Sequence, residues 1–233
     1  MIHVMEKEKA LRAKRAAGAR AAEMVEDRMV VGLGTGSTVK FAMEGLAARM
    51  REGLRIQGIP TSVQTAIRAR DLGIPLTTLD DHPALDVAID GADQVDRRKR
   101  LIKGRGAALT REKIVAAAAE RLVIVVDDAK LVDQLHGVVP NEVLPFALGP
   151  VLSSLRTMGA VPVVREGVAK DGPVISDNGG IIVDADFGEI QDPRELEHAV
   201  TIIPGVICTG LFTNFPKKTT VVVGGEKGDV RIL

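Results

Sequence analysis

The sequence predicts an α/β protein: a doubly wound, mostly parallel, Rossmann-like sheet with an inserted, smaller α+β domain of ferredoxin-like type. Three observations lead to this fold class. Short apolar runs alternate with helical patterns over the first half of the chain. One run, residues 122–126, is apolar throughout, as expected of a central parallel strand covered on both faces. After about residue 135, the pattern changes to several short strands and two helices.

The first half of the chain contains alternating predicted elements. Residues 6–26 are rich in Ala, Glu, Lys and Arg and lack Pro, which predicts a helix. Residues 29–33 form a short apolar run with glycines at its end, which predicts a buried strand. A helix is expected to begin near Ser37 and to reach about residue 50. The next predicted elements are, in order, strand 54–59, helix 63–71, strands 75–79, 85–89 and 100–102, helix 110–120 and strand 122–126.

The second half predicts a split βαβ unit. Its predicted strands are 138–143, 161–165 and 180–183, and its predicted helices are 148–158 and 193–199. The order β-α-β-β-α-β is typical of a small α+β domain. Residues 219–223 are expected to form a strand that returns to the first sheet. We therefore predict a Rossmann-like catalytic domain, residues 1–134 and 208–233, and a small lid or assembly domain, residues 135–207.

The composition is that of an ordinary globular protein and argues against several classes of function. The 233 residues are 45% hydrophobic and 27% charged, with a formal net charge of zero. The lack of a basic surplus and the 2% aromatic content argue against nucleic-acid binding. The charged N-terminus does not resemble a signal peptide and no apolar run reaches membrane-spanning length, so a cytoplasmic protein is expected. The single cysteine, Cys208, excludes an intrachain disulfide and is expected to be a buried thiol.

A glycine-rich segment, residues 32–38, follows the first predicted strand. Its sequence, Gly-Leu-Gly-Thr-Gly-Ser-Thr, fits neither a Walker A loop nor a dinucleotide-binding fingerprint. Glycines let backbone N–H groups converge, and a helix N-terminus adds partial positive charge, so the segment favours an anion such as phosphate. Thr35, Ser37 and Thr38 would add hydroxyl donors. The alternative is a tight turn with a helix cap.

Two carboxylates stand in the turn 90–93, Asp-Gly-Ala-Asp, which follows predicted strand 85–89. The residues alone leave three interpretations open: a plain turn, a Mg²⁺ or Ca²⁺ site, or a site for sugar hydroxyl groups. Residues 34–38, 90–93 and 127–130 each follow a predicted strand. In a doubly wound fold such segments share the ligand-binding edge of the sheet, so we expect all three to lie there.

The segment 102–113 is the most informative part of the chain. A glycine-rich stretch opens an Ala-rich helix, and Glu112 lies between two cations near the start of that helix. A glutamate there is often only a partner of the helix dipole or of a capping box. If Lys103 and Lys130 flank the same cleft, these cations could stabilise the charge of a developing enolate. Together with a phosphate-binding loop, that combination suits sugar-phosphate chemistry.

These segments together resemble type A ribose-5-phosphate isomerase over nearly the whole chain. The matching motifs are GLGTGST (32–38), DGAD (90–93), KGRGAALTREK (103–113), DDAK (127–130), SDNGG (176–180) and IPGVICTGLF (203–212). The resemblance implies interconversion of ribose 5-phosphate and ribulose 5-phosphate in the non-oxidative pentose phosphate pathway. It implies an enediol route with no metal and no cofactor. It also implies a homodimer or homotetramer.

The resemblance also implies roles for individual residues. Glu112 would be the general base that moves a proton between C2 and C1. Asp90, Asp93 and Lys103 would be its catalytic partners, with the two aspartates acting in ring opening and proton shuttling. The substrate-binding residues that the resemblance implies are Lys14, Thr35, Gly36, Ser37, Thr38, Asp90, Gly91, Ala92, Asp93, Lys103, Gly104, Arg105, Gly106 and Lys130.

Two positions depart from the pattern of the family. The family usually has Lys-Gly-Gly-Gly where this chain has Lys-Gly-Arg-Gly, with Arg105 as the third residue. Arginine would be costly there if the loop needs a positive φ at this position, and its side chain is expected to point to solvent. Cys208 stands where many relatives carry an acidic residue. It is expected to affect structure or assembly more than chemistry.

Two other classes of function stay open. A non-catalytic sugar-phosphate sensor could share the fold, but the chain has no evident helix-turn-helix extension and keeps Glu112, Asp90 and Asp93. A coenzyme A transferase or an amino-sugar-phosphate deaminase could use a related scaffold. A transferase would need a glutamate as covalent nucleophile.

Overall fold

The computed structural model describes residues 2–233, with side chains from residue 5 onward. The chain forms two compact units. The first contains the described residues up to Ala92, with Ile114–Leu131 and Lys217–Leu233, and the second contains Asp93–Lys113 and Val132–Pro216. The chain therefore passes between the units repeatedly. The predicted roles of a catalytic domain and a lid or assembly domain stay a prediction.

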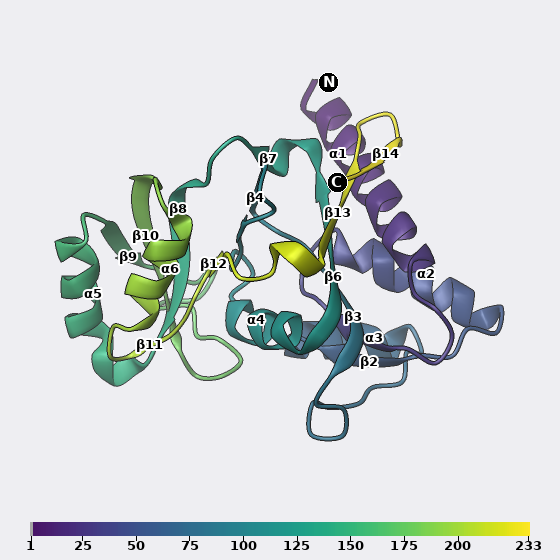
Figure 1. Cartoon of the computed structure of the whole chain (residues 1–233), viewed down its shortest axis with the longest axis horizontal. Coiled ribbons are helices and arrows are strands. Elements are labelled where there is room, and N and C mark those ends of the chain that lie inside the picture. The colour runs from purple at the N-terminus through teal and green to yellow at the C-terminus, as the bar shows by residue number, and fades with distance from the viewer. Residues whose placement is uncertain (1) are drawn as a thin grey trace. The chain divides into compact units, whose positions relative to one another are not determined.

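A six-stranded sheet forms the centre of the first unit, in the order β14-β13-β6-β3-β1-β2 (Figure 1). Its strands are β1 (Val30–Leu33), β2 (Gln57–Pro60), β3 (Leu85–Asp90), β6 (Ala119–Asp127), β13 (Thr219–Gly224) and β14 (Val230–Ile232). Neighbouring strands pair in parallel, except that β13 and β14 are antiparallel. This arrangement confirms the predicted, mostly parallel sheet and the return of the last long strand to pair with β6.

Helices pack on both faces of this sheet. On one face, α1 (Ile2–Glu23) and α2 (Val39–Arg51) contact each other and share an apolar core with strand residues such as Ile89. On the other face, α4 (Leu109–Ala118) approaches β1 at Gly32, where a Cβ atom would overlap the side chain of Val115. Only glycine permits this close approach. Burial on both faces explains why β6 is apolar along most of its length.

A four-stranded antiparallel sheet forms the core of the second unit, in the order β11-β8-β10-β9. Its elements follow the chain as β8 (His136–Val143), α5 (Leu148–Thr157), β9 (Val161–Val164), β10 (Ile181–Glu189), α6 (Pro193–Thr201) and β11 (Val206–Thr209). Leu155 of α5 and Val200 of α6 pack into one cluster with Val183 of β10. The predicted ferredoxin-like β-α-β-β-α-β order is confirmed, and β11 is its fourth strand, to which the prediction assigned no residues.

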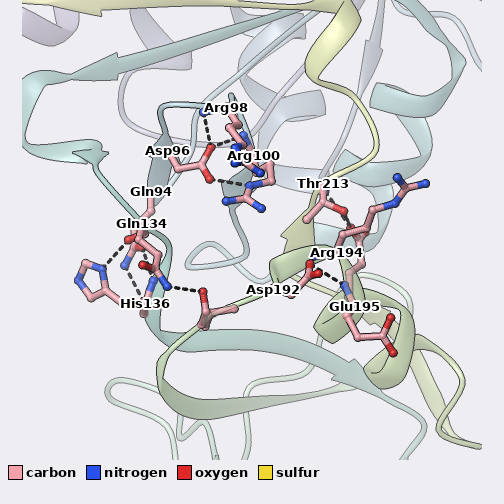
Figure 2. A network of polar contacts seen from close by, with 12 residues as sticks. Gln94, Asp96, Arg98, Arg100, Gln134, His136, Asp192, Arg194, Glu195 and Thr213 are labelled. Carbon is pink, nitrogen blue, oxygen red and sulfur yellow. Dashed lines mark hydrogen bonds and ion pairs between the residues drawn. The ribbon is translucent and has the colours of Figure 1, made fainter.

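A smaller sheet, in the order β12-β5-β4-β7, includes the segment that leads into the second glycine-rich loop. Its strands are β4 (Gln94–Asp96), β5 (Leu101–Ile102), β7 (Leu131–Val132) and β12 (Leu211–Phe212). Figure 2 shows that the Asp96 carboxylate shapes the β4–β5 hairpin: it accepts hydrogen bonds from the N–H groups of Arg98 and Arg100 and from Arg100 Nε. Gln94 binds the backbone of His136 through two further hydrogen bonds. The side chains of this hairpin thus attach it to β8.

Some predicted elements differ from the structure. Residues 75–79 do not form the predicted strand: two of the five are threonines, and their one strand-like pairing is an isolated bridge between Leu76 and Gly58. Strand β5 lies within the predicted strand 100–102, whereas β4, β7 and β12 were not predicted. At two or three residues each, they are too short for a periodic pattern to define. Helix α3 (Val63–Asp71) has the predicted bounds. Among the described residues, no helix has both the length and the apolar character needed to cross a membrane.

Cys208 is a buried thiol, as predicted. Its residue is 7% exposed and packs with Leu109 and Ile182. Burial raises the pKa of Cys208 above its ordinary value of 9.0, because the charged thiolate is poorly solvated there. The folded protein therefore holds the thiol proton more tightly than the unfolded chain. Any stability linked to this group is present below pH 9 and is lost as the pH rises above that value.

We expect Cys208 to react very slowly with a thiol reagent such as DTNB at about pH 8 in the folded protein, because the thiolate is the reactive form. Absorbance at the reagent's product wavelength measures the reaction. Full labelling of one thiol in guanidinium chloride is the control. Rapid labelling of the folded protein would contradict the assignment of a buried, protonated thiol.

Candidate active site

The predicted site residues divide between the two units. In the first unit they are Lys14, Thr35, Gly36, Ser37, Thr38, Asp90, Gly91, Ala92 and Lys130. In the second unit they are Asp93, Lys103, Gly104, Arg105, Gly106 and Glu112. Within the units they form a glycine loop with a basic pocket, an edge of the parallel sheet, and a loop beside a buried ion pair.

The first glycine-rich loop connects β1 to α2 and packs against Asp90. The N–H group of Gly34 donates to the carbonyl oxygen of Ile89 over 2.9 Å, and a Cβ atom at Gly34 would overlap the Asp90 carboxylate. Gly36 has a φ of 151°, which L side chains rarely adopt. Thr38 is the N-cap of α2, but its side chain forms no capping hydrogen bond to any residue that the structure describes. The start of α2 can therefore take an anion.

Hydroxyl groups hold this loop in place. Thr35 Oγ1 lies 2.9 Å from Thr61 Oγ1, 2.8 Å from Ser62 Oγ and 3.1 Å from Thr65 Oγ1. Thr65 Oγ1 also donates to the carbonyl of Gly34, and Ser62 caps α3 by accepting from the N–H group of Thr65. Thr35, predicted as a phosphate donor, thus joins the loop to the start of α3. The sequence signal for its partners, a possible cap at Ser62, is weak.

A basic pocket of about 560 Å³ opens beside the loop. Its lining residues are Lys7, Ala10, Leu11, Lys14, Thr35, Gly36, Ser37, Lys40, Phe41, Gln64, Thr65 and Arg68. Four of them are cationic, and the described lining contains no carboxylate. Lys14 was predicted here, whereas Lys7, Lys40 and Arg68 were missed. Lys7 stands two helical turns before Lys14, and that spacing, which places both on one face of α1, could have identified it.

The carboxyl ends of β1, β3 and β6 are neighbours in the sheet, as predicted for the segments that follow them. Asp90, at the end of β3, is buried, and its Oδ1 accepts from the N–H group of Gly91 over 2.8 Å. Lys130 is half-buried and ends the short 3-10 helix η1 (Asp128–Lys130) after β6. Asp127 Oδ1, at the end of β6, is buried and has no hydrogen-bond partner among the described residues. This edge therefore offers carboxylate acceptors to a ligand.

The second glycine-rich loop follows Lys103. Gly104 has a φ of 112°, and a Cβ atom there would lie 2.8 Å from Pro140 Cβ. Ala107 also has a positive φ, of 59°. Arg105 does not have a positive φ, so an arginine at this position causes no left-handed backbone strain. Its side chain is exposed, as expected.

Asp93 and Arg165 hold the backbone of this loop. The N–H group of Arg105 donates to Asp93 Oδ2 over 3.0 Å. Arg165, which follows β9, donates from Nη1 to the carbonyl oxygens of Gly104 at 2.9 Å and Arg105 at 3.1 Å. Its Nε binds Asp184 Oδ2 at 2.7 Å, so the guanidinium is itself fixed. Sequence reasoning missed Arg165, because no local pattern reveals a contact over sixty residues away.

Lys103 and Glu112 form a buried ion pair. Both side chains are 4% exposed, and Lys103 Nζ lies 3.2 Å from Glu112 Oε2. Glu112 is in the first turn of α4, where its N–H group donates to the carbonyl of Ala108. The Phe212 ring lies near two ammonium groups, with its centre 5.6 Å from Lys103 Nζ and 4.7 Å from Lys113 Nζ. Water screens such a buried pair poorly, so its charges interact strongly.

The ion pair of the second unit has the groups for acid/base chemistry, and the pocket of the first unit has the groups for binding an anion. A carboxylate beside a fixed ammonium can accept a proton while the cation stabilises negative charge on a nearby oxygen. The basic pocket has the chemistry that binds phosphate groups. Among the described residues, no group of three or more His, Cys, Asp or Glu side chains is arranged to hold a metal ion.

The sequence profile of ribose 5-phosphate isomerase A (phosphoriboisomerase A) matches residues 57–228 of the chain. The chain belongs to the ribose 5-phosphate isomerase A family. Ribose-5-phosphate isomerase A of Methanoregula boonei is 63% identical over 215 residues, which cover 92% of this chain and 91% of that protein. The enzyme of the same name from Methanosarcina acetivorans is 50% identical over 221 residues, which cover 94% and 93% of the two chains.

Solved structures agree with the sequence comparisons. Ribose 5-phosphate isomerase A of Methanocaldococcus jannaschii matches with a TM-score of 0.89 and 43% identity, covering 94% of this chain and 97% of that one. A D-ribose-5-phosphate isomerase in complex with phospho-erythronic acid matches with a TM-score of 0.90 and 44% identity, covering 94% and 96%. The family and the fold class predicted from the sequence are therefore confirmed.

We expect Arg165→Met to loosen the second glycine-rich loop, because it removes two hydrogen bonds from a charged donor to the loop carbonyls. Such bonds contribute about 1.5–3 kcal/mol each. Hydrogen exchange measured by mass spectrometry should become faster in peptides covering residues 103–107. The matched control is Arg156→Met, an exposed arginine of the same unit. Unchanged exchange in the Arg165 variant would show that Arg165 does not hold the loop.

Proposed function

We propose that this chain interconverts ribose 5-phosphate and ribulose 5-phosphate through an enediol(ate) intermediate, in the non-oxidative pentose phosphate pathway. Its membership of the isomerase family supports the overall reaction. The observation that carries the proposed mechanism is the buried ion pair of Lys103 and Glu112. Neither a metal nor a cofactor takes part in the proposed route.

Glu112 is the proposed general base. The proton on C2 of the open-chain aldose is only weakly acidic, so its removal needs a base within hydrogen-bond reach and a donor for the developing oxyanion. The Glu112 carboxylate takes this proton and returns it to C1, while the Lys103 ammonium stabilises the enediolate oxygen. The distance of 3.2 Å between Lys103 Nζ and Glu112 Oε2 supports this division of roles, because a carboxylate and an ammonium group lie side by side.

The basic pocket beside the first glycine-rich loop is the proposed phosphate site. Lys14, Ser37 and the N-terminus of α2 supply positive charge and hydrogen-bond donors. Thr35, Gly36 and Thr38 shape the loop. An anchored phosphate contributes binding energy remote from the reacting carbons, and that energy can position them.

Carboxylates and a further lysine complete the proposal. Asp90, in the turn with Gly91 and Ala92, would act in ring opening, and Asp93 would shuttle protons between the substrate oxygens. Gly104, Arg105 and Gly106 would contact the sugar through the loop backbone, and Lys130 would bind it from the end of β6. The relative solved with phospho-erythronic acid supports this picture, because a sugar-acid phosphate pairs a phosphate with a planar carboxylate that resembles an enediolate.

We expect Glu112→Gln to lower kcat by about 10²–10⁴-fold, the usual contribution of a general base, while ribose 5-phosphate still binds. A coupled assay for ribulose 5-phosphate measures kcat, and calorimetry measures binding. The matched control is Glu120→Gln, an exposed glutamate just past the same helix, which should leave both values unchanged. Turnover of the Glu112 variant near that of the parent protein would refute the assignment of the base. The same assay with EDTA tests the metal-free route, since loss of activity that Mg²⁺ restores would point to a metal site.

We also propose that the protein works in the cytoplasm as a homodimer or homotetramer, with residues 135–207 as a lid or assembly domain. Exposed apolar side chains of the second unit support assembly. Phe146 is 95% exposed, and Val161 and Val163 are exposed on β9, an edge strand of its sheet. Edge strands of this kind readily pair with other chains.

Light scattering should give two or four times the chain mass of 24.7 kDa. Replacing both Val161 and Val163 with lysine should shift the mass towards one chain, if β9 contributes to the interface, because charged edge strands resist pairing. A mass of 24.7 kDa for the parent protein at every concentration would contradict the proposed assembly.

A further inference from the structure

Glu142 is a completely buried carboxylate that the proposed reaction does not use. It lies in β8, and its residue is 0% exposed. Ser176 Oγ donates to Glu142 Oε1 over 2.6 Å, and Thr110 Oγ1 donates to Glu142 Oε2. Asn178 Nδ2 lies 3.2 Å from Oε1 and 3.4 Å from Oε2. Every one of these contacts supplies a donor to the carboxylate.

The turn at residues 176–180 closes directly on this carboxylate. The N–H group of Ser176 donates to the carbonyl of Gly180, and that of Gly179 donates back to Ser176. A Cβ atom at Gly180 would lie 2.5 Å from Glu142 Cγ, so any larger residue would push the turn away. The SDNGG motif thus forms a tight turn that packs against the Glu142 carboxylate.

The same turn holds the residues that immediately precede the proposed base. Arg111 Nε donates to Asn178 Oδ1 over 2.8 Å, and its Nη2 donates to the carbonyl of Asp177 over 3.0 Å. Thr110 binds Glu142 itself. Residues 110 and 111, in the first turn of α4, are therefore both attached to Glu142 or to the turn around it. Glu112 is the next residue in the chain.

We propose that Glu142 is a positioning residue for Glu112, acting through Thr110 and through the turn at residues 176–180. This inference rests on the proposed function of Glu112 as base. Rotation or displacement of the first turn of α4 would move the Glu112 carboxylate relative to Lys103. Misplacement of a reacting group by about 1 Å can lower a rate by about 10²-fold.

The chemistry of the contacts explains why this position needs a carboxylate. An ionised carboxylate only accepts hydrogen bonds, and it meets two hydroxyl groups and an amide NH₂. A glutamine in the same place would turn its own NH₂ towards one of these donors. Asn178 Nδ2 approaches both oxygens, so neither orientation of a glutamine amide avoids a conflict between two donors. Glu142→Gln therefore disturbs the contacts with little change in shape.

Thr110→Val and Glu142→Gln test the proposal together. Each should lower kcat about 10- to 100-fold and leave KM for ribose 5-phosphate within about twofold, because the phosphate contacts lie elsewhere. Thr110→Ser keeps the hydroxyl and should restore most of kcat. The double variant should lose about as much kcat as the more impaired of the two single variants, because both changes break one chain of contacts.

Thr209→Val is the matched control. Thr209 is buried in the same unit, and its Oγ1 has no hydrogen-bond partner among the described residues, so the same substitution removes a hydroxyl that binds nothing. Its kcat should equal that of the parent protein. Circular dichroism and melting temperatures verify folding. If Glu142→Gln does not fold, the kcat values of Thr110→Val, Thr110→Ser and Thr209→Val still test the proposal.

A kcat equal to that of the parent protein in folded Thr110→Val would overturn the proposal. A rise in KM with no fall in kcat would also overturn it. So would a Thr110→Ser variant that does not recover activity. Failure of the proposed function gives a different result. In that case Glu112→Gln itself keeps its activity. An inactive Glu112→Gln with a fully active Thr110→Val refutes positioning and leaves the base assignment standing.

Discussion

Parallel pairing of β6, β3 and β1 brings three segments that are far apart in the sequence to one edge of a sheet. The first glycine-rich loop, Asp90 and Lys130 all lie at that edge because each follows one of these strands. The pairing requires apolar strands with helices on both faces, and the close approach at Gly32 satisfies that requirement on one face. At the edge itself, Gly34 leaves no space beside the Asp90 carboxylate. The backbone geometry of the sheet therefore sets both the place and the orientation of this part of the candidate site.

In the second unit, buried acidic side chains near the start of α4 are each paired with polar or charged partners. Three residues near the start of α4, Thr110, Glu112 and Lys113, each contact a buried charged side chain. Glu112 pairs with Lys103, and Lys113 pairs with Glu197, which also accepts from Thr213. Glu142, in contrast, is held by neutral donors alone among its described hydrogen bonds. An isolated buried charge is very unfavourable, so the loss of any one of these partners would destabilise the start of the helix.

The sequence was sufficient for the family, for the fold class and for most of the longer elements. Long periodic or wholly apolar segments, such as α3 and β6, were located well, because helix and strand periods differ and burial on two faces leaves a clear pattern. The strand predicted at residues 75–79 was wrong, because this partly polar segment pairs only at Leu76. The sequence analysis placed Glu112 and Lys103 in the same site but did not predict their ion pair. It did not predict the contacts of Glu142 and Arg165, because these contacts join segments that only the folded chain brings together. A glutamate in a strand also gives no local sign that it is fully buried.

The strand order also determines which parts of the protein can fold while the chain is being synthesised. Strand β6 ends at Asp127, but its partner β13 begins only at Thr219, after about ninety further residues. At roughly 5–20 residues per second, a ribosome needs roughly 5–20 s to make that segment. During this interval the most apolar strand of the sheet has one open edge on the nascent chain. The ferredoxin-like unit is made in the same interval, so it can fold before the first sheet is complete. The last residues of the chain therefore close the parallel sheet, and a ribosome that stalls before residue 219 leaves an aggregation-prone edge exposed.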